Sequence, residues 1–393
     1  MLRYDYLIVG GGMTADAAVS ALVAGEPKGK IGLVSAESDP PYNRPPLTKG
    51  LWKDETLGSV WLKSARLGAT LHLARRVERL DVDEKQAIDD EGQVYAYDKL
   101  LLATGGRPRR LPFDTDNEIV YYRTLADYRR VSNLAEEKER FAVIGGGFIG
   151  SELAAGLAMN GKDVTILFPE RGIGGLRFPG DLAEFLSEYY GDKGVTVEAG
   201  ALVSGIAREG KGYVLTSRDG KEYRADLVIA GIGIEANTQL ADAAGIEIDD
   251  GIVVDRSLRT SQPDVFAAGD VAAFYDPVLG KRRRVEHEDN ALTMGKMAGR
   301  AMVGEPMIYE HSPYFYSDLF DLGYEAVGEL DSRLETVSDW QEEFRKGVVY
   351  YLEEKQVRGV LLWNVWGQVD AARDIIAQGE RFEPEDLKGR LPV

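Results

Sequence analysis

Two short segments of the chain have the glycine spacing of a phosphate-binding turn. They are Gly10, Gly12 and Ala15 in the first segment, and Gly145, Gly147 and Gly150 in the second. The first glycine of such a turn allows the tight bend, the second lets a pyrophosphate approach the backbone, and the small third residue lets helix and strand pack closely. The pyrophosphate lies at a helix N-terminus, where free N–H groups and the helix dipole favour an anion. One copy is a weak signal, but two copies in matching surroundings predict two dinucleotide sites.

An acidic residue should follow each turn to hold an adenosine ribose. Glu170 lies 25 residues after Gly145, just past a predicted strand, and fits this role. Glu37 fits less cleanly, because it lies one residue later than expected and Ala36 occupies the expected place. A carboxylate at Glu170 repels a 2′-phosphate and so favours NADH over NADPH, although the neighbouring Arg171 works against this preference. Both acids also fit the simpler interpretation of solvated loop charges.

Two dinucleotide sites in one chain indicate electron transfer between two dinucleotides. The ordinary pairing that does this is a flavin dinucleotide with a nicotinamide dinucleotide. The sequence therefore predicts FAD and NADH as cofactors.

The elements that position these turns are repeated about 135 residues apart. Each turn follows a short apolar strand and opens an alanine-rich helix, over residues 17–24 and 152–159, before a second strand at 31–35 and 164–168. Short alternating strands follow, at 77–82 and 93–97 in the first copy and at 195–198 and 213–216 in the second. The segments 97–106 and 224–233 close the two copies. A duplicated domain with an antiparallel insertion explains this order.

The remaining segments predict the rest of the architecture. An apolar strand at 265–270 precedes a helix over 290–302, and strands at 326–330, 348–352 and 360–364 precede a helix at 369–378. The fold class is α/β, with two Rossmann-like dinucleotide-binding domains and a C-terminal α+β domain. We expect the FAD-binding domain at 1–115 and 237–311, the NAD(H)-binding domain at 116–236, and the C-terminal domain, a dimerisation-like interface, at 312–393.

Composition excludes several other classes of function. The 393 residues include no cysteine and three histidines, so disulfides, thiolate nucleophiles, cysteine-held iron–sulfur clusters and a metal site are not expected. The formal net charge of −18 argues against a nucleic-acid partner. No apolar run is long enough for a transmembrane helix, and the chain enters a strand at once, so we expect no signal peptide and a cytoplasmic location.

Several motifs carry a resemblance to a known family. The flavin-loop-like segment is 41–49, and the others are 167–170, 282–287, 315–318, 323–326 and 359–364. Together with the two turns, they resemble the two-dinucleotide flavoprotein reductases of the pyridine nucleotide–disulfide oxidoreductase superfamily. Within it the chain resembles the apoptosis-inducing factor group over nearly its whole length, and the ferredoxin reductases of oxygenase systems. It departs from that group at Tyr316, where tryptophan is usual, and in lacking proline within 235–237.

The resemblance assigns roles by matching position. Arg44 and Lys49 would contact the flavin, with Thr104, Gly105 and Asp270 around its phosphate and ribitol. Lys49 and Glu152 would form an ion pair beside the isoalloxazine. Phe148 would cover the nicotinamide pocket, Glu325 would hold the nicotinamide amide, and His287 and Tyr316 would lie against the flavin. The further expected cofactor contacts are Met13, Thr14, Val77, Arg129, Ile149, Gly233, Gly269, Glu286 and Trp363.

Simpler interpretations of these residues remain open. Lys49 fits a solvated loop lysine, His287 a structural hydrogen-bonding residue, and Tyr316 and Trp363 plain core aromatics. The basic run at 281–284 indicates a local loop patch, of use for a phosphate or an anionic partner.

The predicted function is an FAD-dependent NADH oxidoreductase. Hydride passes from NADH to flavin N5, and an undetermined acceptor (a quinone, a dye, oxygen or a small redox protein) takes the electrons. One alternative is a slow redox sensor, in which a flavin–NAD charge-transfer complex controls conformation or homodimerisation. A second is an NADH:ferredoxin or rubredoxin reductase, which the acidic chain disfavours because ferredoxins are usually acidic. The catalytic residues would be Lys49, Glu152, Phe148, His287 and Glu325.

Overall fold

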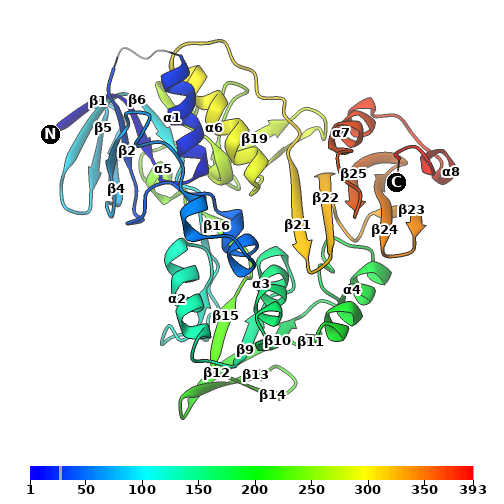
Figure 1. Cartoon of the computed structure of the whole chain (residues 1–393). Helices are drawn as coiled ribbons and strands as arrows, with labels where there is room; N and C mark the ends of the chain where they lie inside the picture. Colours follow the sequence, from blue (N-terminus) through cyan, green and yellow to red (C-terminus); the bar gives the residue numbers. More distant parts are fainter. Residues whose placement is uncertain (26–28, 393) are drawn as a thin grey trace. The chain divides into compact units, whose positions relative to one another are not determined.

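The computed structural model describes residues 1–25 and 29–392 and forms two compact units. Unit 1 comprises Met1–Arg44, Leu57–Arg107 and Glu235–Pro313, and unit 2 comprises Pro45–Thr56, Pro108–Ile234 and Tyr314–Val393. Figure 1 shows the elements of each unit. The expected NAD(H)-binding and C-terminal domains lie mostly in one unit, and the division into three domains stays a prediction.

Unit 1 is built on a seven-stranded sheet in the order β3-β2-β1-β6-β5-β4, with β18 also paired to β6. Its strands are β1 (Leu2–Val9), β2 (Ile31–Val34), β3 (Thr70–His72), β4 (Val77–Asp81), β5 (Gln86–Asp89), β6 (Val94–Leu102) and β18 (Val265–Ala267). The parallel strands are β3, β2, β1, β6 and β18, whereas β5 and β4 pair antiparallel. The strand expected at 93–97 and the strand of the closing segment 97–106 are in fact one strand, β6. The first half of β6 pairs with β5 and its second half with β18, so β6 carries the antiparallel insertion directly into the parallel sheet.

The other elements of unit 1 surround this sheet. They are α1 (Met13–Ala24), η3 (Leu57–Val60), β7 (Gly106–Pro108), β16 (Ile234–Ala236), α5 (Gln239–Ala243), β17 (Ile252–Val253), η4 (Gly269–Val271), β19 (Ala272–Asp276), β20 (Lys281–Arg283) and α6 (Glu288–Met302), of which β7 and β16 extend across the unit boundary in sequence. The helix expected at 290–302 is α6, which begins two residues earlier.

Unit 2 contains a second parallel sheet, in the order β11-β10-β9-β15-β8. Its strands are β8 (Val120–Tyr121), β9 (Arg140–Ile144), β10 (Asp163–Phe168), β11 (Val195–Ala199) and β15 (Leu227–Ala230). The expectation that 195–198 belongs to the antiparallel insertion was wrong, because β11 pairs parallel with β10. The insertion is instead β12 (Val203–Glu209), β13 (Gly212–Ser217) and β14 (Glu222–Ala225). The order β3-β2-β1-β6 in unit 1 matches the order β11-β10-β9-β15 in unit 2, where each series runs from the third strand of its copy to the closing strand. This shared order supports a duplication.

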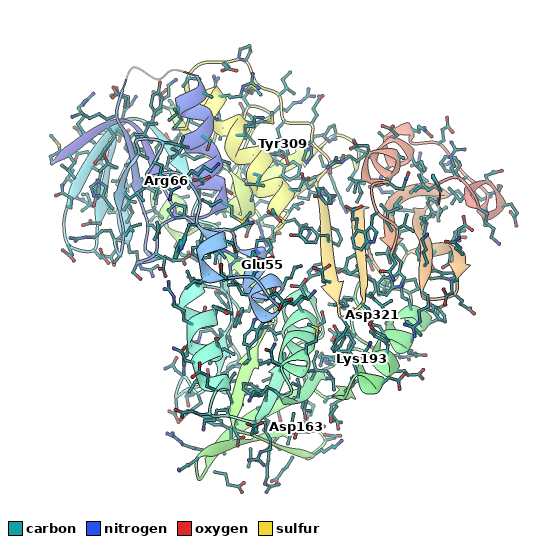
Figure 2. All side chains as sticks on the ribbon, in the orientation of Figure 1. Glu55, Arg66, Asp163, Lys193, Tyr309 and Asp321 are labelled. Carbon is teal, nitrogen blue, oxygen red and sulfur yellow. The ribbon has the colours of Figure 1, made fainter. Side chains whose placement is uncertain are left out.

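The C-terminal part of unit 2 is a five-stranded antiparallel sheet in the order β21-β22-β25-β24-β23. Its strands are β21 (Tyr314–Leu319), β22 (Leu322–Gly328), β23 (Glu335–Glu342), β24 (Lys346–Glu353) and β25 (Gln356–Trp363). The helices and turns of unit 2 are η1 (Pro45–Leu47), η2 (Gly50–Trp52), α2 (Leu125–Ala135), α3 (Phe148–Met159), α4 (Gly180–Asp192), α7 (Val369–Gln378) and α8 (Pro384–Leu387). Figure 2 labels Lys193 and Asp321, whose 2.7 Å ion pair joins the end of α4 to the β21–β22 turn. No helix in 1–25 or 29–392 is long and apolar enough to cross a membrane.

Two glycines let α6 pack directly on α1 in unit 1. A Cβ at Gly295 would lie 2.3 Å from the carbonyl oxygen of Thr14, and one at Gly299 would lie 2.6 Å from that of Ala18. Backbone atoms cannot move aside as a flexible side chain can, so a methyl group must push the helices apart.

We expect Gly299→Ala to lower the free energy of unfolding by about 2 kcal/mol, as overpacking usually does. The measurement is the thermal unfolding midpoint. Gly191→Ala in α4 is the control: nothing lies within 4 Å of its added Cβ, so the better helix propensity of alanine should raise stability by about 0.5 kcal/mol. Equal midpoints for the two variants would contradict this packing.

Candidate cofactor-binding sites

The first glycine turn joins β1 to α1 in unit 1. Gly10 has φ +125°, and a Cβ there would lie 2.0 Å from the carbonyl oxygen of Ala103. Gly12 is the N-cap residue of α1, receives no side-chain cap and has open space where its Cβ would be. Ala15 is fully buried. The free N–H groups of α1 therefore face a cradle without a side chain, which fits a pyrophosphate.

The second turn, between β9 and α3 in unit 2, repeats this geometry. Gly145 has φ +114°, and a Cβ there would lie 2.5 Å from the carbonyl oxygen of Gly231. Gly147 is the uncapped N-cap residue of α3 and has open space beside it. A Cβ at Gly150 would lie 1.8 Å from the carbonyl oxygen of Gly145. Both turns thus fit a dinucleotide.

Near the first turn, Glu37 and Arg44 form an ion pair of 3.0 Å. Tyr42 donates a 2.6 Å hydrogen bond to the same carboxylate and lies under the Arg44 guanidinium. Burial alone would lower the pKa of Arg44, but Tyr42, Glu37 and Asp270 outweigh burial and raise it. Arg44 is therefore a fixed cation. The carboxylate of Glu37 is already engaged in this cluster.

Several more of the predicted FAD residues lie in unit 1. Thr14 and Gly269 approach closely, since a Cβ at Gly269 would lie 2.2 Å from the hydroxyl of Thr14. Thr104 donates to the Asn237 carbonyl at 2.9 Å, and the Asn237 backbone N–H donates to the Gly105 carbonyl at 3.0 Å. Four more residues of unit 1 are placed as follows: the Met13 sulfur accepts from the Arg44 N–H, Val77 is buried at the start of β4, the Glu286 carboxylate accepts from Arg284, and His287 is the N-cap residue of α6.

The arginines of the basic run at 281–284 form hydrogen bonds and ion pairs with other residues of unit 1. Arg282 donates to the carbonyls of Val254 and Ala273, and Arg283 pairs with Asp276 at 3.1 Å. Arg284 donates to the carbonyl of Asp270 at 3.1 Å. These arginines are therefore engaged with neighbouring backbone and acids, and the expected use of the run for an anion stays a prediction.

Lys49 and Glu152 form an ion pair of 2.6 Å in unit 2. The Glu152 side chain is 3% exposed and that of Lys49 is 14% exposed, so Lys49 is not a solvated loop lysine. The Lys49 ammonium lies 5.0 Å from the centre of the Tyr316 ring. The structure thus brings together three predicted site residues; their relation to a flavin stays a prediction.

A small pocket opens beside the second turn, in unit 2. Its lining includes Gly147, Phe148, Arg177, Leu319 and Tyr324. The Arg177 guanidinium lies 4.3 Å from the centre of the Phe148 ring. Arg177 has no acidic partner among the residues that the structure describes. Burial raises the pKa of Tyr324, and Arg177 opposes that shift.

Glu170 and Glu325 are the two predicted acids of the nicotinamide nucleotide site. Glu170 follows β10, is half-buried and has no side-chain partner within 1–25 and 29–392, so its carboxylate is available to a ribose. Glu325 lies on β22, and its carboxylate accepts from the Gly367 N–H at 3.1 Å.

The remaining predicted residues are spread through unit 2. Ile149 is in the first turn of α3, Gly233 has φ +89° after β15, and Arg129 is half-buried on α2. Trp363 is fully buried; it donates to the Phe344 carbonyl at 2.9 Å and stacks on Tyr324. Trp363 therefore has no exposed surface for a ligand.

Three residues of these sites were missed from the sequence. Arg177 follows Glu170 by seven residues, and this nearness to a predicted acid was its only signal. The hydroxyls of Thr48 and Ser317 both donate to Glu152, and nothing in their spacing indicates that they meet.

Two Rossmann-like sheets, each with an uncapped glycine turn at a helix N-terminus, define an oxidoreductase fold with places for two dinucleotides. The comparisons agree with this class. The chain belongs to the pyridine nucleotide-disulphide oxidoreductase family, whose model matches residues 4–295. The model for the C-terminal part of apoptosis-inducing factor, mitochondrion-associated, matches residues 298–342 and 338–378. Members of the family bind FAD and NADH or NADPH. The disulfide of the family name has no counterpart here, because the chain contains no cysteine.

Individual relatives cover nearly the whole chain. Mitochondrial apoptosis-inducing factor 1 of Dictyostelium discoideum is 35% identical over 97% of this chain and 80% of its own length. The ferredoxin–NAD(+) reductase component of the anthranilate 1,2-dioxygenase system of Burkholderia cepacia is 30% identical over 97% and 96%. A putidaredoxin reductase, solved as a covalent complex with putidaredoxin, matches with TM-score 0.90 and 30% identity over 98% and 95%. The family and the α/β fold class expected from the sequence are confirmed.

Proposed function

We propose that this protein is an FAD-dependent NADH oxidoreductase. The observation that carries the proposal is the pair of glycine turns, each ending at a helix N-terminus that no side chain caps. When bound, the flavin accepts a hydride from the reduced nicotinamide at N5 and passes its electrons to an acceptor. The chain's own residues bind and orient the two dinucleotides, and such positioning supplies much of the acceleration in a hydride transfer.

In unit 2, the N–H groups at the start of α3 bind the nicotinamide nucleotide pyrophosphate. Arg177 is the nearby cation without an acidic partner in the described chain, and we assign it to the same phosphates. Glu170 binds the adenosine ribose and disfavours a 2′-phosphate, which is why NADH is proposed over NADPH. Phe148, whose ring contacts the Arg177 guanidinium, is retained as the residue that covers the nicotinamide pocket.

In unit 1, the N–H groups at the start of α1 bind the FAD pyrophosphate, with the half-buried Arg44 as a cation and Asp270 nearby. From the family resemblance we retain Lys49, which lies in unit 2, as the cation that stabilises the negative charge of reduced flavin, with Glu152 as its counter-charge. The roles of His287, Tyr316 and Glu325 proposed from the family resemblance are retained here. Trp363 is retained only as the support of Tyr324.

This function has two alternative forms, a reductase that passes electrons to a small redox protein and a slow redox sensor, and they differ in the electron acceptor. Relatives named as ferredoxin and putidaredoxin reductases favour a small redox protein as acceptor, whereas the net charge of −18 opposes an acidic one. The match to the C-terminal part of apoptosis-inducing factor favours the second form, a slow redox sensor in which NADH binding controls conformation or dimerisation. A homodimer, the absence of a nucleic-acid partner and a cytoplasmic location stay predictions.

Anaerobic stopped-flow mixing of the FAD-loaded protein with NADH tests the function. We expect rapid bleaching of the flavin absorbance, followed by fast reoxidation when the true acceptor is added. A long-wavelength absorbance band that persists in air would support the sensor form instead. A purified protein that retains no flavin would contradict both.

Glu170→Ala tests the preference between NADH and NADPH. Removing the ribose contact should lower the NADH:NADPH ratio of kcat/KM about tenfold, in the range of one hydrogen bond to a charged group. Glu184→Ala is the control, because Glu184 is an exposed acid on α4 of the same unit. An unchanged ratio would remove Glu170 from the ribose role.

A further inference from the structure

The carboxylate of Glu152, on α3, accepts hydrogen bonds from three residues in two other segments of unit 2. Lys49 donates to Oε1 at 2.6 Å, Ser317 donates to Oε1 at 2.6 Å, and Thr48 donates to Oε2 at 2.5 Å. Thr48 and Lys49 lie between η1 and η2, Glu152 lies on α3, and Ser317 lies on β21. The three segments are far apart in sequence, so this convergence is a feature of the tertiary structure.

The hydroxyls of Thr48 and Ser317 stabilise this buried carboxylate by donating hydrogen bonds to it. Glu152 is 3% exposed, and a buried charge is costly unless it is paired and its lone pairs accept hydrogen bonds. Lys49 donates to Oε1 only, whereas the Ser317 hydroxyl is a second donor to Oε1 and the Thr48 hydroxyl donates to Oε2. A valine at position 48 or an alanine at position 317 would fill much of the same space without donating.

The carboxylate in turn locates the Lys49 ammonium. The ammonium lies 2.6 Å from Oε1 of Glu152 and 5.0 Å from the centre of the Tyr316 ring. A lysine side chain has four rotatable bonds, so a carboxylate fixed by two additional donors restricts it far more than a mobile carboxylate would. Ser317 is buried, lies opposite Tyr324 in the strand pairing and so ties the pair to the C-terminal sheet.

We propose that Thr48 and Ser317 are positioning residues for electron transfer: their hydroxyls fix the Glu152 carboxylate, which holds the Lys49 charge where it stabilises the reduced flavin. This inference rests on the proposed function. Neither hydroxyl acts on a cofactor directly, and each works through Glu152.

The test compares FAD-loaded Thr48→Val, Ser317→Ala and the double variant with the unmodified protein. The first measurement is the flavin reduction potential, obtained by equilibration with a reference dye and dithionite, without NADH. The second is the rate at which an amine-reactive reagent labels Lys49, read by peptide mass spectrometry. Lys162 is the internal reference, because its side chain is also 14% exposed and paired with an acid in the same unit.

Two control variants separate positioning from packing. Thr48→Ser keeps the hydroxyl and should restore both measurements. Ser217→Ala removes another buried serine hydroxyl of unit 2 that donates to a carboxylate, that of Asp219, far from Glu152 in sequence. It should lower thermal stability and leave the flavin potential unchanged.

In the double variant we expect the equilibrium constant for flavin reduction to fall about tenfold and Lys49 labelling to rise about tenfold relative to Lys162, as the loss of hydrogen bonds to a charged group implies. An unchanged potential overturns the proposal, whether or not labelling changes, because the hydroxyls would then serve packing alone. A protein that NADH fails to reduce refutes the proposed function separately, since the dye measurement still reports on Thr48 and Ser317.

Discussion

Gly150→Ala is expected to abolish flavin reduction by NADH while the FAD of unit 1 remains bound. The added Cβ would lie 1.8 Å from the carbonyl oxygen of Gly145, in the same turn. Because both partners are backbone, the turn must open and the start of α3 must shift. We expect the free energy of unfolding of unit 2 to fall by about 3 kcal/mol, at the upper end for overpacking. The measurements are bound flavin per chain and the rate of its reduction at saturating NADH.

Gly147→Ala separates the phosphate cradle from the fold. No atom lies within 4 Å of its added Cβ, so the protein should keep its thermal stability. The methyl group would stand where a pyrophosphate approaches, so KM for NADH should rise about tenfold or more. Gly180→Ala at the start of α4 is the control, because its Cβ also meets open space at a helix N-terminus. Equal KM values for the two variants would place the nucleotide elsewhere.

The sequence predicted those parts of the fold that depend on residues close to one another in the chain. A glycine turn requires small residues at fixed spacing, and the backbone contacts at Gly10, Gly145 and Gly150 show why. Buried parallel strands such as β10 read as apolar runs, and the helix α7 was predicted with its observed bounds. These signals lie within a few residues of one another, so single segments carry them.

The sequence-based predictions failed where the structure depends on contacts between residues that are far apart in the sequence. β6 was divided because its two halves pair with different partners, and no residue marks the change. The edge strand β23 was missed, since its polar outer face resembles a loop. The partners of the arginines in the basic run could not be predicted, because most of their acceptors are carbonyl oxygens, which a sequence does not display.

The candidate site also contains residues that could be predicted from the sequence and residues that could not. The Lys49–Glu152 pair came from family resemblance, and the structure shows the ion pair itself. Thr48 and Ser317 could not be predicted, because hydroxyl residues are common and these two meet only through tertiary packing. Arg177 is a similar case, since its lack of an acidic partner is visible only once its surroundings are known.

Glu152→Leu is expected to cost about 3 kcal/mol of unfolding free energy, which for a unit of this size lowers the thermal midpoint by about 8 °C. It leaves the Lys49 ammonium without its counter-charge and two buried hydroxyls without their acceptor. The Coulomb attraction of the pair is only part of this cost, because an unpaired buried charge also loses hydration that nothing replaces.

The double variant Lys49→Met/Glu152→Leu distinguishes the pair from the packing around it. Removing both charges should recover about half of the lost stability, because similar-sized apolar groups replace a buried pair at little net cost. The flavin potential should stay low in both variants, since neither retains a fixed cation beside the reduced flavin. Stability and function would then separate: the double variant is stable but slow, and Glu152→Leu alone is both unstable and slow. With Lys49→Met alone completing the cycle, strictly additive changes in unfolding free energy would show that the two side chains contribute independently. The 2.6 Å ion pair would then be a close contact without energetic coupling.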